Sequence, residues 1–181
     1  MKTKIVVSCF VALVALLLGA GCAHAPENTG AGAAAVAVTF NQPENFTDVK
    51  SSSIGSDKER DSLLDELRDY VVEQAPRFLK DGQALSIVFN DIDMAGDFEP
   101  WRGPALDDVR IVKDIYPPRI ALVFSLKDAG GAEIAGGARN LTDLAFMSTI
   151  PVTVFRDDRL RHEKTLLYNW FSGELARLAR Q

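Results

Sequence analysis

The sequence predicts an α+β fold: a mixed, mainly antiparallel sheet of four to five strands with two helices packed on one face. Three segments alternate apolar and polar residues with the period of two that is typical of half-buried strands. Two others carry apolar residues three and four positions apart, as amphipathic helices do. These segments follow one another as strand, helix, strand, loop, three or four strands and helix, which is an order typical of α+β domains.

The N-terminus is expected to be an export signal rather than part of the domain. Lys2 and Lys4 form a short positive region, and the apolar run 5–18 that follows is too short to span a bilayer. Small residues then lead into Cys22, a pattern that resembles the processing site of bacterial lipoproteins. We therefore predict a lipoprotein-type signal peptide over residues 1–21 and lipidation of Cys22.

The alternative is ordinary signal cleavage after the A-x-A pattern at residues 23–25. Pro26 would then follow the cleaved bond, and its fixed φ and missing N–H make it a poor residue there. A lone cysteine at an exported N-terminus also favours lipidation.

Residues 22–35 read as a flexible tether, followed by a single domain over 36–181. The tether is rich in Ala and Gly, has no hydrophobic period, and reaches on the order of 20 Å as a flexible coil. By resemblance to other lipoproteins of Gram-negative bacteria, Ala23 after the cysteine implies sorting to the outer membrane, with the domain on the periplasmic side.

The charge balance argues against nucleic acid as a partner. Without Lys2 and Lys4, 18 basic residues stand against 25 acidic ones, a formal charge of −7. Binding to phosphates requires a basic face, which this composition does not favour. The membrane anchor and another envelope protein are the partners that we expect.

The first half of the domain is predicted to run strand, helix, strand. Residues 36–40 alternate as a strand, and Ser56 with Glu59 forms a capping box at the start of a helix. Pro76 cannot donate a backbone hydrogen bond, so the helix should end or kink just before it. Residues 85–89 alternate again, and this strand is expected to run into the following loop at Asn90 or Asp91.

The second half is predicted to form a hairpin and a last helix. A short strand at 109–113 and a long strand at 120–126 precede a turn at 128–131, and a strand over 133–144 returns. We expect the long strand and its hairpin partner to form the sheet centre, with Arg139 on a face open to water. A further short strand at 150–155 is an option, and the final helix should start at Asp157 and Asp158.

The loop from Asp91 to Pro118 is the segment of the domain that hydrophobic packing explains least. It holds seven carboxylates, one of the two tryptophans and four of the eight prolines. Loops of this length without secondary structure of their own are more often functional than incidental. The candidate binding surface consists of Asp91, Asp93, Asp97, Phe98, Trp101, Arg102, Arg110 and Tyr116.

The acidic part of this loop has three interpretations. The run from Asp91 with Gly96 at its sixth position resembles a calcium loop, but the fifth position is Ala95 and the twelfth is Arg102, where a bidentate Glu is required. The same carboxylates could form a glycosidase-like pair. The simplest interpretation is a structural loop in which arginines pair with the aspartates.

Other kinds of site find little support in the sequence. His162 is interpreted as a solvated helix residue, and no nucleophile motif, zinc-ligand set, phosphate loop or dinucleotide fingerprint is present. We therefore expect no cofactor and no metal.

Trp101 and Arg102 allow two interpretations. Trp101 could fill a gap in a loop folded back on the domain, with Arg102 stacked on it or paired with Asp107 or Asp108. Alternatively, Trp101 could be an exposed anchor for a partner, because Trp, Tyr and Arg dominate interface hot spots. Phe98 and Tyr116 would complete the apolar part of that surface.

Four sequence runs carry a family resemblance: FTDVK, DIDMAGDFEPWRGP, VRIVKDIYPPRIALVFSL and LRHEKTLLYNWF. With them, the chain resembles the bacterial family catalogued as domain of unknown function 3016 over about Val36 to Phe171. The resemblance implies an exported, often lipidated single-domain protein of Gram-negative bacteria. It carries no catalytic residues over to this chain.

The sequence as a whole favours a non-enzymatic binding module that uses the loop 91–116. A small-ligand or divalent-cation binding protein is the alternative, and a hydrolase of envelope material is a third. A partner surface predicts an exposed Trp101, a metal site predicts converging oxygens of the loop aspartates, and an enzyme predicts a cleft with two separated carboxylates.

Overall fold

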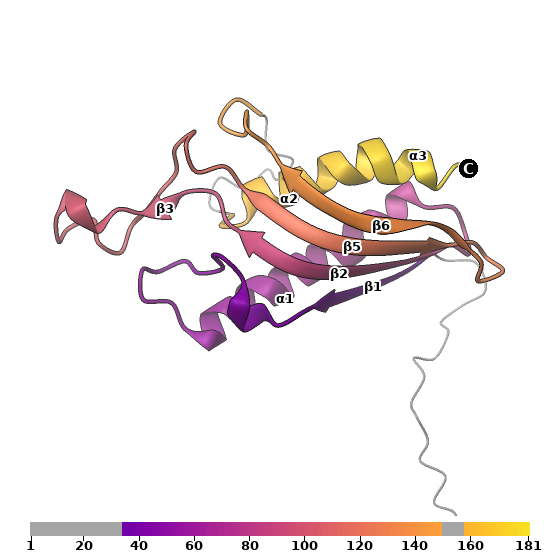
Figure 1. Cartoon of the computed structure of the whole chain (residues 1–181), viewed down its shortest axis with the longest axis horizontal. Helices are drawn as coiled ribbons and strands as arrows, with labels where there is room; N and C mark the ends of the chain where they lie inside the picture. Colours follow the sequence, from indigo (N-terminus) through magenta and orange to yellow (C-terminus); the bar gives the residue numbers. More distant parts are fainter. Residues whose placement is uncertain (1–33, 150–157) are drawn as a thin grey trace, which may run out of the picture.

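The computed structural model describes residues 34–149 and 158–181, and its core is a sheet covered on one face by helices (Figure 1). The sheet order is β1-β2-β5-β6. Its strands are β1 (Ala35–Phe40), β2 (Ala84–Asp93), β5 (Arg119–Lys127) and β6 (Glu133–Thr142). The helices are α1 (Asp57–Gln74), α2 (Arg161–Trp170) and α3 (Ala176–Leu178), and a π-helical turn (Phe171–Leu175) joins the last two. The predicted α+β class, with a mixed sheet and two main helical segments, is confirmed.

The sheet is mixed because β1 and β2 are parallel while the other neighbours are antiparallel. The crossover from β1 to β2 passes through α1, and β5 and β6 form the predicted hairpin. We expected this hairpin at the centre of the sheet, but β6 is an edge strand. The centre is instead β2 and β5, because the parallel β1 adds outside β2 and nothing in the described residues adds outside β6.

One face of the sheet is buried and the other is open. Along β5, Ile120, Leu122, Phe124 and Leu126 are buried, while their neighbours are more exposed. The buried side chains of the sheet and of the helices form one contiguous core. The alternating pattern of the sequence therefore identifies the helix-covered face.

Helix α1 begins and ends at the predicted signals. The Ser56 hydroxyl accepts a hydrogen bond from the Glu59 backbone N–H at 3.2 Å, as an N-cap does. The Glu59 carboxylate does not complete the capping box, because it accepts hydrogen bonds from Ser51 and Ser52 instead. At the other end the helix stops at Gln74 and continues as a 3-10 turn that contains Pro76.

Several predicted boundaries and one predicted side-chain orientation differ from the structure. β2 continues to Asp93 through a bulge between Phe89 and Asp91. The last helix begins at Arg161 rather than at the aspartates before it, and the Asp158 carboxylate accepts a hydrogen bond from the Leu160 N–H. Arg139 does not face water: it pairs with Glu174 on the helix side of the sheet.

Several predictions concern residues that the structure does not describe. The signal peptide, Cys22 and nearly all of the tether lie within residues 1–33, and the optional strand at 150–155 lies within 150–157. Among the helices in the described ranges, none is long and apolar enough to cross a membrane.

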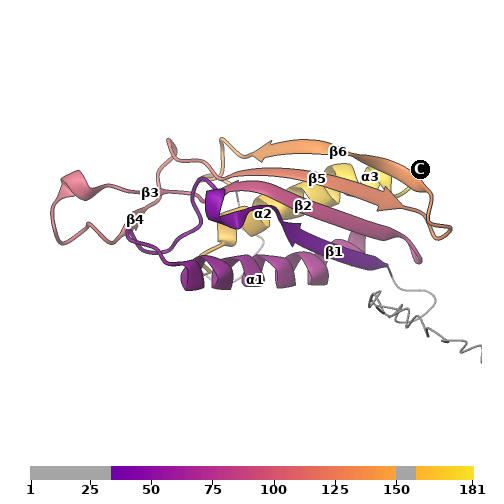
Figure 2. The same cartoon turned by 60° about the horizontal axis from the view of Figure 1, so that its bottom comes forward.

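The two ends of the sheet differ in what they carry. β1 starts at the end where the hairpin of β5 and β6 turns, and the long excursion between β2 and β5 leaves from the opposite end (Figures 1 and 2). We call residues 94–118 of this excursion the arm. The arm contains β3 (Asp97–Phe98), a 3-10 turn (Pro100–Arg102) and β4 (Arg110–Ile111).

Candidate functional site

The arm is a narrow ribbon that projects beyond the sheet. β3 and β4 pair antiparallel, with Asp97 opposite Ile111 and Phe98 opposite Arg110. In Figure 1 the arm extends along the strand direction, away from the helices. Such a short ribbon cannot be stabilised by backbone pairing alone, so its side chains must hold it.

Glu99 ties the arm together from inside. Its side chain is only 2% exposed, and its carboxylate accepts hydrogen bonds from Lys113 at 2.5 Å and from the Tyr116 hydroxyl at 3.1 Å. Arg102 pairs with the second carboxylate oxygen. The hydrogen bond from Lys113, with those from Arg102 and Tyr116, holds the pKa of Glu99 below its usual value. The outgoing and returning halves of the arm therefore meet at one ionised carboxylate.

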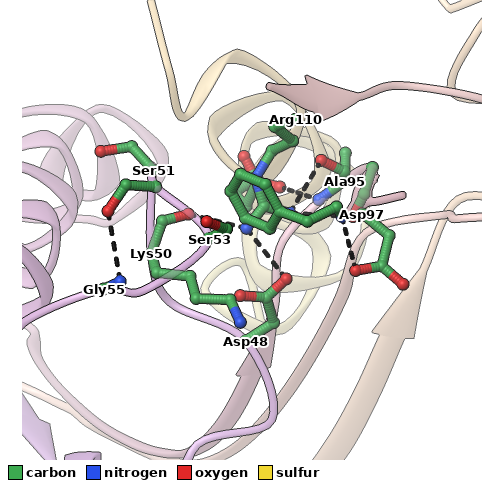
Figure 3. A network of polar contacts seen from close by, with 12 residues as sticks. Asp48, Lys50, Ser51, Ser53, Gly55, Ala95, Asp97 and Arg110 are labelled. Carbon is green, nitrogen blue, oxygen red and sulfur yellow. Dashed lines mark hydrogen bonds and ion pairs between the residues drawn. The ribbon is translucent and has the colours of Figure 1, made fainter. Parts of the chain in front are cut away.

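Arg110 fastens the arm to the segment before α1 (Figure 3). Its guanidinium donates to the Gly96 carbonyl at 2.8 Å, to the Asp48 carboxylate at 2.9 Å and to the Lys50 carbonyl at 2.7 Å. It also lies over the Phe98 ring, 4.8 Å from the centroid. A planar group with several donors suits this role, because it can bind acceptors from both segments at once.

Glu163 holds the base of the arm from the opposite side. This residue of α2 is 1% exposed, and its carboxylate accepts a hydrogen bond from the Ala95 N–H at 2.7 Å. Its second oxygen is buried and has no protein partner among the described residues. Burial raises the pKa of Glu163 to about 7. The backbone at the start of the arm is thus held by a hydrogen bond to a carboxyl group whose pKa is close to neutral.

The three aspartates of the predicted acidic cluster go to three different partners. Asp91 accepts hydrogen bonds from the N–H and hydroxyl of Thr47, at 2.6 and 2.7 Å. Asp93 pairs with Arg119 at 3.1 Å, and Asp97 caps the backbone N–H of the residue that follows it. Asp91 and Asp93 do lie on one face of β2, as expected if the strand continued. Within the described ranges, no group of three or more His, Cys, Asp or Glu side chains is placed to hold a metal ion.

A cavity of about 340 Å³ lies between the arm and the segment before α1. Asp48 and Asp93 line it, and burial raises the pKa of both carboxyl groups although Arg110 and Arg119 partly oppose this effect. Lys50 and Tyr116 also line the cavity. The pocket is therefore polar, and its two partly buried acids, Asp48 and Asp93, are paired with arginines.

Trp101 is the exposed aromatic residue of the arm. It lies in the 3-10 turn and is 72% exposed. The folded-back interpretation paired Arg102 with Asp107 or Asp108. In the structure, Arg102 pairs with Glu99 instead. Phe98 is 8% exposed, so it supports the arm from inside instead of joining Trp101 in an exposed patch.

Exposed apolar side chains gather in the loops at the arm end of the molecule. Six of the eight large hydrophobic residues that are exposed in the described ranges lie there, on the arm, before α1 or after β6. They are Ile54, Trp101, Val109, Ile115, Leu144 and Met147. Ser53 joins two of these loops, because its N–H and hydroxyl both donate to Asp108 at 2.7 and 3.0 Å.

The interpretation of His162 as a solvated helix residue is wrong. The His162 ring is half-buried edge-on against Phe146, 4.9 Å between centroids, and burial lowers its pKa to about 4. Glu163 and Lys164 are buried, and Lys164 pairs with Glu66. Their positions three and four residues after Leu160, on the apolar stripe, were the signal that could have predicted this burial.

A family model described as protein of unknown function (DUF3016) matches residues 34–173. The chain belongs to this family. The suspected family resemblance is thereby confirmed, and the DUF3016 match includes the whole arm together with Glu99, Arg110 and Glu163. No curated protein and no solved structure matched the chain. For this DUF3016 protein, function must be inferred from the site itself.

Proposed function

We propose that this DUF3016 protein is a lipid-anchored envelope protein on the periplasmic side of the outer membrane, a non-enzymatic module that binds another envelope component with its arm. The observation that carries the proposal is the 72% exposure of Trp101 at the tip of a braced projection. An exposed tryptophan suits a binding role, because Trp, Tyr and Arg dominate the binding energy at interfaces.

The bracing of the arm supports a binding role. Glu99 and Arg110 fix both halves of the arm through contacts within the chain itself. A surface ordered in advance loses less conformational entropy when it binds, so more of the contact energy remains as affinity. The apolar loops around the arm offer a partner additional contact area.

The anchor part of the proposal rests on the N-terminal sequence. A short apolar run followed by small residues and Cys22 favours processing as a lipoprotein. Stable membrane attachment by acyl chains needs more than one of them, which a lipidated N-terminal cysteine would supply.

A small-ligand binding protein is the second candidate, because the polar cavity beside Asp48 and Asp93 has room for one. A divalent cation is a weaker occupant, since the loop aspartates do not converge. Catalysis by a carboxylate pair is weaker still, because Asp48 and Asp93 are each tied to an arginine.

The arm is tested by photocrosslinking in cells. A photoreactive residue replaces Trp101 in one variant and Val72, an exposed residue of α1, in a matched control. We expect one discrete adduct from position 101 and none from position 72. The protein in that adduct, once purified, should bind the full-length chain about tenfold more weakly after Trp101→Ala but not after Val72→Ala. Equal affinity of both variants would overturn the proposal.

The anchor is tested separately with Cys22→Ser. The unmodified chain should incorporate labelled palmitate and sediment with membranes, whereas the variant should do neither. An unlabelled mature protein that begins at Pro26 would establish ordinary signal cleavage instead.

Thermal melting tests whether a divalent cation occupies the cavity. Calcium or magnesium that binds only the folded full-length chain must raise its melting temperature. A rise that Asp93→Ala abolishes would favour a cation site in the cavity, and an unchanged melting temperature would count against one.

A further inference from the structure

A second surface, separate from the arm, lies at the edge of the sheet formed by β1. Within the described residues, β1 pairs with β2 on one side and with no strand on the other. The Ala35 N–H donates to the Gln83 carbonyl and the Asn41 N–H to the Phe89 carbonyl. In a parallel pair, alternate residues direct their backbone groups to the same neighbour. The residues whose N–H and C=O groups face outward are therefore Val36, Val38 and Phe40.

A groove runs beside this edge, between β1 and α1. Figure 2 shows α1 running alongside β1 at the bottom of the molecule. The groove has a volume of about 440 Å³, and Val38, Phe40 and Leu64 form its apolar part. The Arg68 guanidinium lies over the Phe40 ring, 5.0 Å from its centroid. A long basic side chain of the protein itself therefore occupies this part of the groove.

The rim of the groove is acidic. Four aspartates follow one another at every fourth position of α1, so they share one side of the helix. They are Asp57, Asp61, Asp65 and Asp69. Asp61 and Asp65 line the groove itself, with side chains 60% and 65% exposed. Arg60 pairs with Asp57 and Asp61, and Arg68 pairs with Asp65, so the four aspartates and two arginines together carry a net charge of −2.

We propose that this edge and groove bind an extended peptide, which adds to the sheet as a fifth strand and carries Lys or Arg at alternate positions. The peptide backbone would pair with the outward groups of β1, as in other cases of strand addition. Its basic side chains would displace Arg68 from Phe40 and Asp65, lay their aliphatic parts on Val38, Phe40 and Leu64, and direct their charges at Asp61 and Asp65. This site lies outside the arm and is independent of the function proposed for it.

A second copy of this chain is a poorer occupant of the edge. In an edge-to-edge dimer, the side chains that β1 would place over the partner's groove are Val36, Val38 and Phe40. None of them carries a positive charge, so the acidic rim of each copy would remain without a counterpart. Only a partner strand of different composition complements the groove.

Peptide binding to the full-length chain provides the test. The probe is a fluorescein-labelled peptide of alternating lysine and valine, and its controls are a scrambled peptide of the same composition and one of alternating glutamate and valine. We expect saturable binding of the lysine–valine peptide alone, measured by fluorescence polarisation. Equal binding of the scrambled peptide would overturn strand addition, because only an alternating peptide presents all its lysines to one face.

N-methylation tests the backbone pairing without altering the protein. In an antiparallel pair, the peptide residue opposite Val38 exchanges both hydrogen bonds with it and places its side chain on the same face. Methylating the backbone nitrogens of the lysines should therefore abolish binding of an antiparallel peptide, while methylating those of the valines should leave it intact; a peptide that adds parallel to β1 would show the reverse. Unchanged binding of both methylated peptides would overturn the proposal.

Charge reversal tests the groove. Asp61→Lys should weaken binding of the lysine–valine peptide about tenfold, because it replaces an attraction by a repulsion. Asp81→Lys changes the net charge equally, and Asp81 is exposed in the turn before β2, so this variant should bind as the unmodified chain does. Equal weakening by both variants would indicate only general electrostatic attraction and would overturn the assignment to the groove.

Discussion

At the scale of single residues, the arm depends on polar groups that are shielded from water. Arg110 and Asp48 are 13% and 12% exposed, and Glu163 is almost completely buried. Charges in such places stabilise a structure only while their partners are present, since an unpaired buried charge is costly. The same groups fix where the arm leaves the sheet.

Removing Arg110 should be costly. Arg110→Ala leaves the Asp48 carboxylate buried without its partner, and we expect the free energy of unfolding to fall by about 3 kcal/mol. Arg77→Ala is the matched control, because its pair with Glu73 is exposed on both sides and such pairs contribute about 0.5 kcal/mol. Urea denaturation measures the free energy of unfolding of both variants. If Arg110→Ala lowers it no more than Arg77→Ala does, the Arg110 network does not stabilise the fold.

Glu163 should make stability depend on pH. Its pKa is about 7 in the folded protein against an ordinary value of 4.5, so the folded state binds the proton more tightly. The stabilisation is complete below pH 4.5 and is lost as the pH rises to 7 and beyond, by an amount on the order of 3 kcal/mol.

Glu163→Gln keeps an acceptor for the Ala95 N–H but does not ionise. Relative to the unmodified chain, its melting temperature should therefore be higher at pH 8 and gain little at pH 5. A difference that does not change between these two pH values would exclude ionisation of Glu163 as the cause.

At the scale of elements, the base of the arm leaves no space for an added side chain. Gly96 has φ +84°, and a Cβ there would lie 2.9 Å from the Ile111 carbonyl oxygen. Gly103, in the outer part of the arm, has φ +106° but no atom within 4 Å of such a Cβ. The two glycines thus share a positive φ and differ in crowding.

Gly96→Ala should destabilise the protein more than Gly103→Ala. Both substitutions strain the backbone by about 1 kcal/mol, and only the first also forces β3 away from β4. Hydrogen exchange of the arm amides should accelerate only in the Gly96 variant. Equal exchange in both variants would mean that the β3–β4 contact is not what orders the arm.

Elements with local signals were predictable and those set by distant contacts were not. Ser56 and Pro76 mark the ends of α1 because a cap and a missing N–H act within one helical turn. The edge position of β6 depends on where β1 adds, about a hundred residues earlier in the chain. The exposure of Trp101 agrees with the exposed-anchor interpretation, but the burial of Glu99 and Phe98 arises from the return of the chain through Arg110 and Lys113.

At the scale of the whole molecule, one core joins both helical segments to the sheet. Domains of this size with a single core usually unfold in one cooperative transition. Trp170 is 5% exposed and contacts Phe124 across the helix–sheet interface, so it reports on this core.

Trp101→Phe leaves Trp170 as the only tryptophan, so the fluorescence of this variant comes from the core. In this variant, the fluorescence of Trp170 and the far-UV circular dichroism should give the same unfolding midpoint. Acrylamide should quench the unmodified chain more strongly than the variant, because the exposed tryptophan is gone. Two separate midpoints would show that the helices and the sheet do not unfold together.

The position of β1 relative to the arm has a consequence for how a partner would be found. The domain starts at one end of the sheet and the arm leaves from the other, separated by strands of nine or ten residues, about 30 Å. With an anchor at Cys22, Trp101 would stay within a limited distance of the membrane surface rather than diffuse through the whole compartment. Confinement of this kind gives effective concentrations on the order of millimolar. An affinity too low to hold two freely diffusing proteins together would then suffice for a partner that is held within the same distance of the membrane.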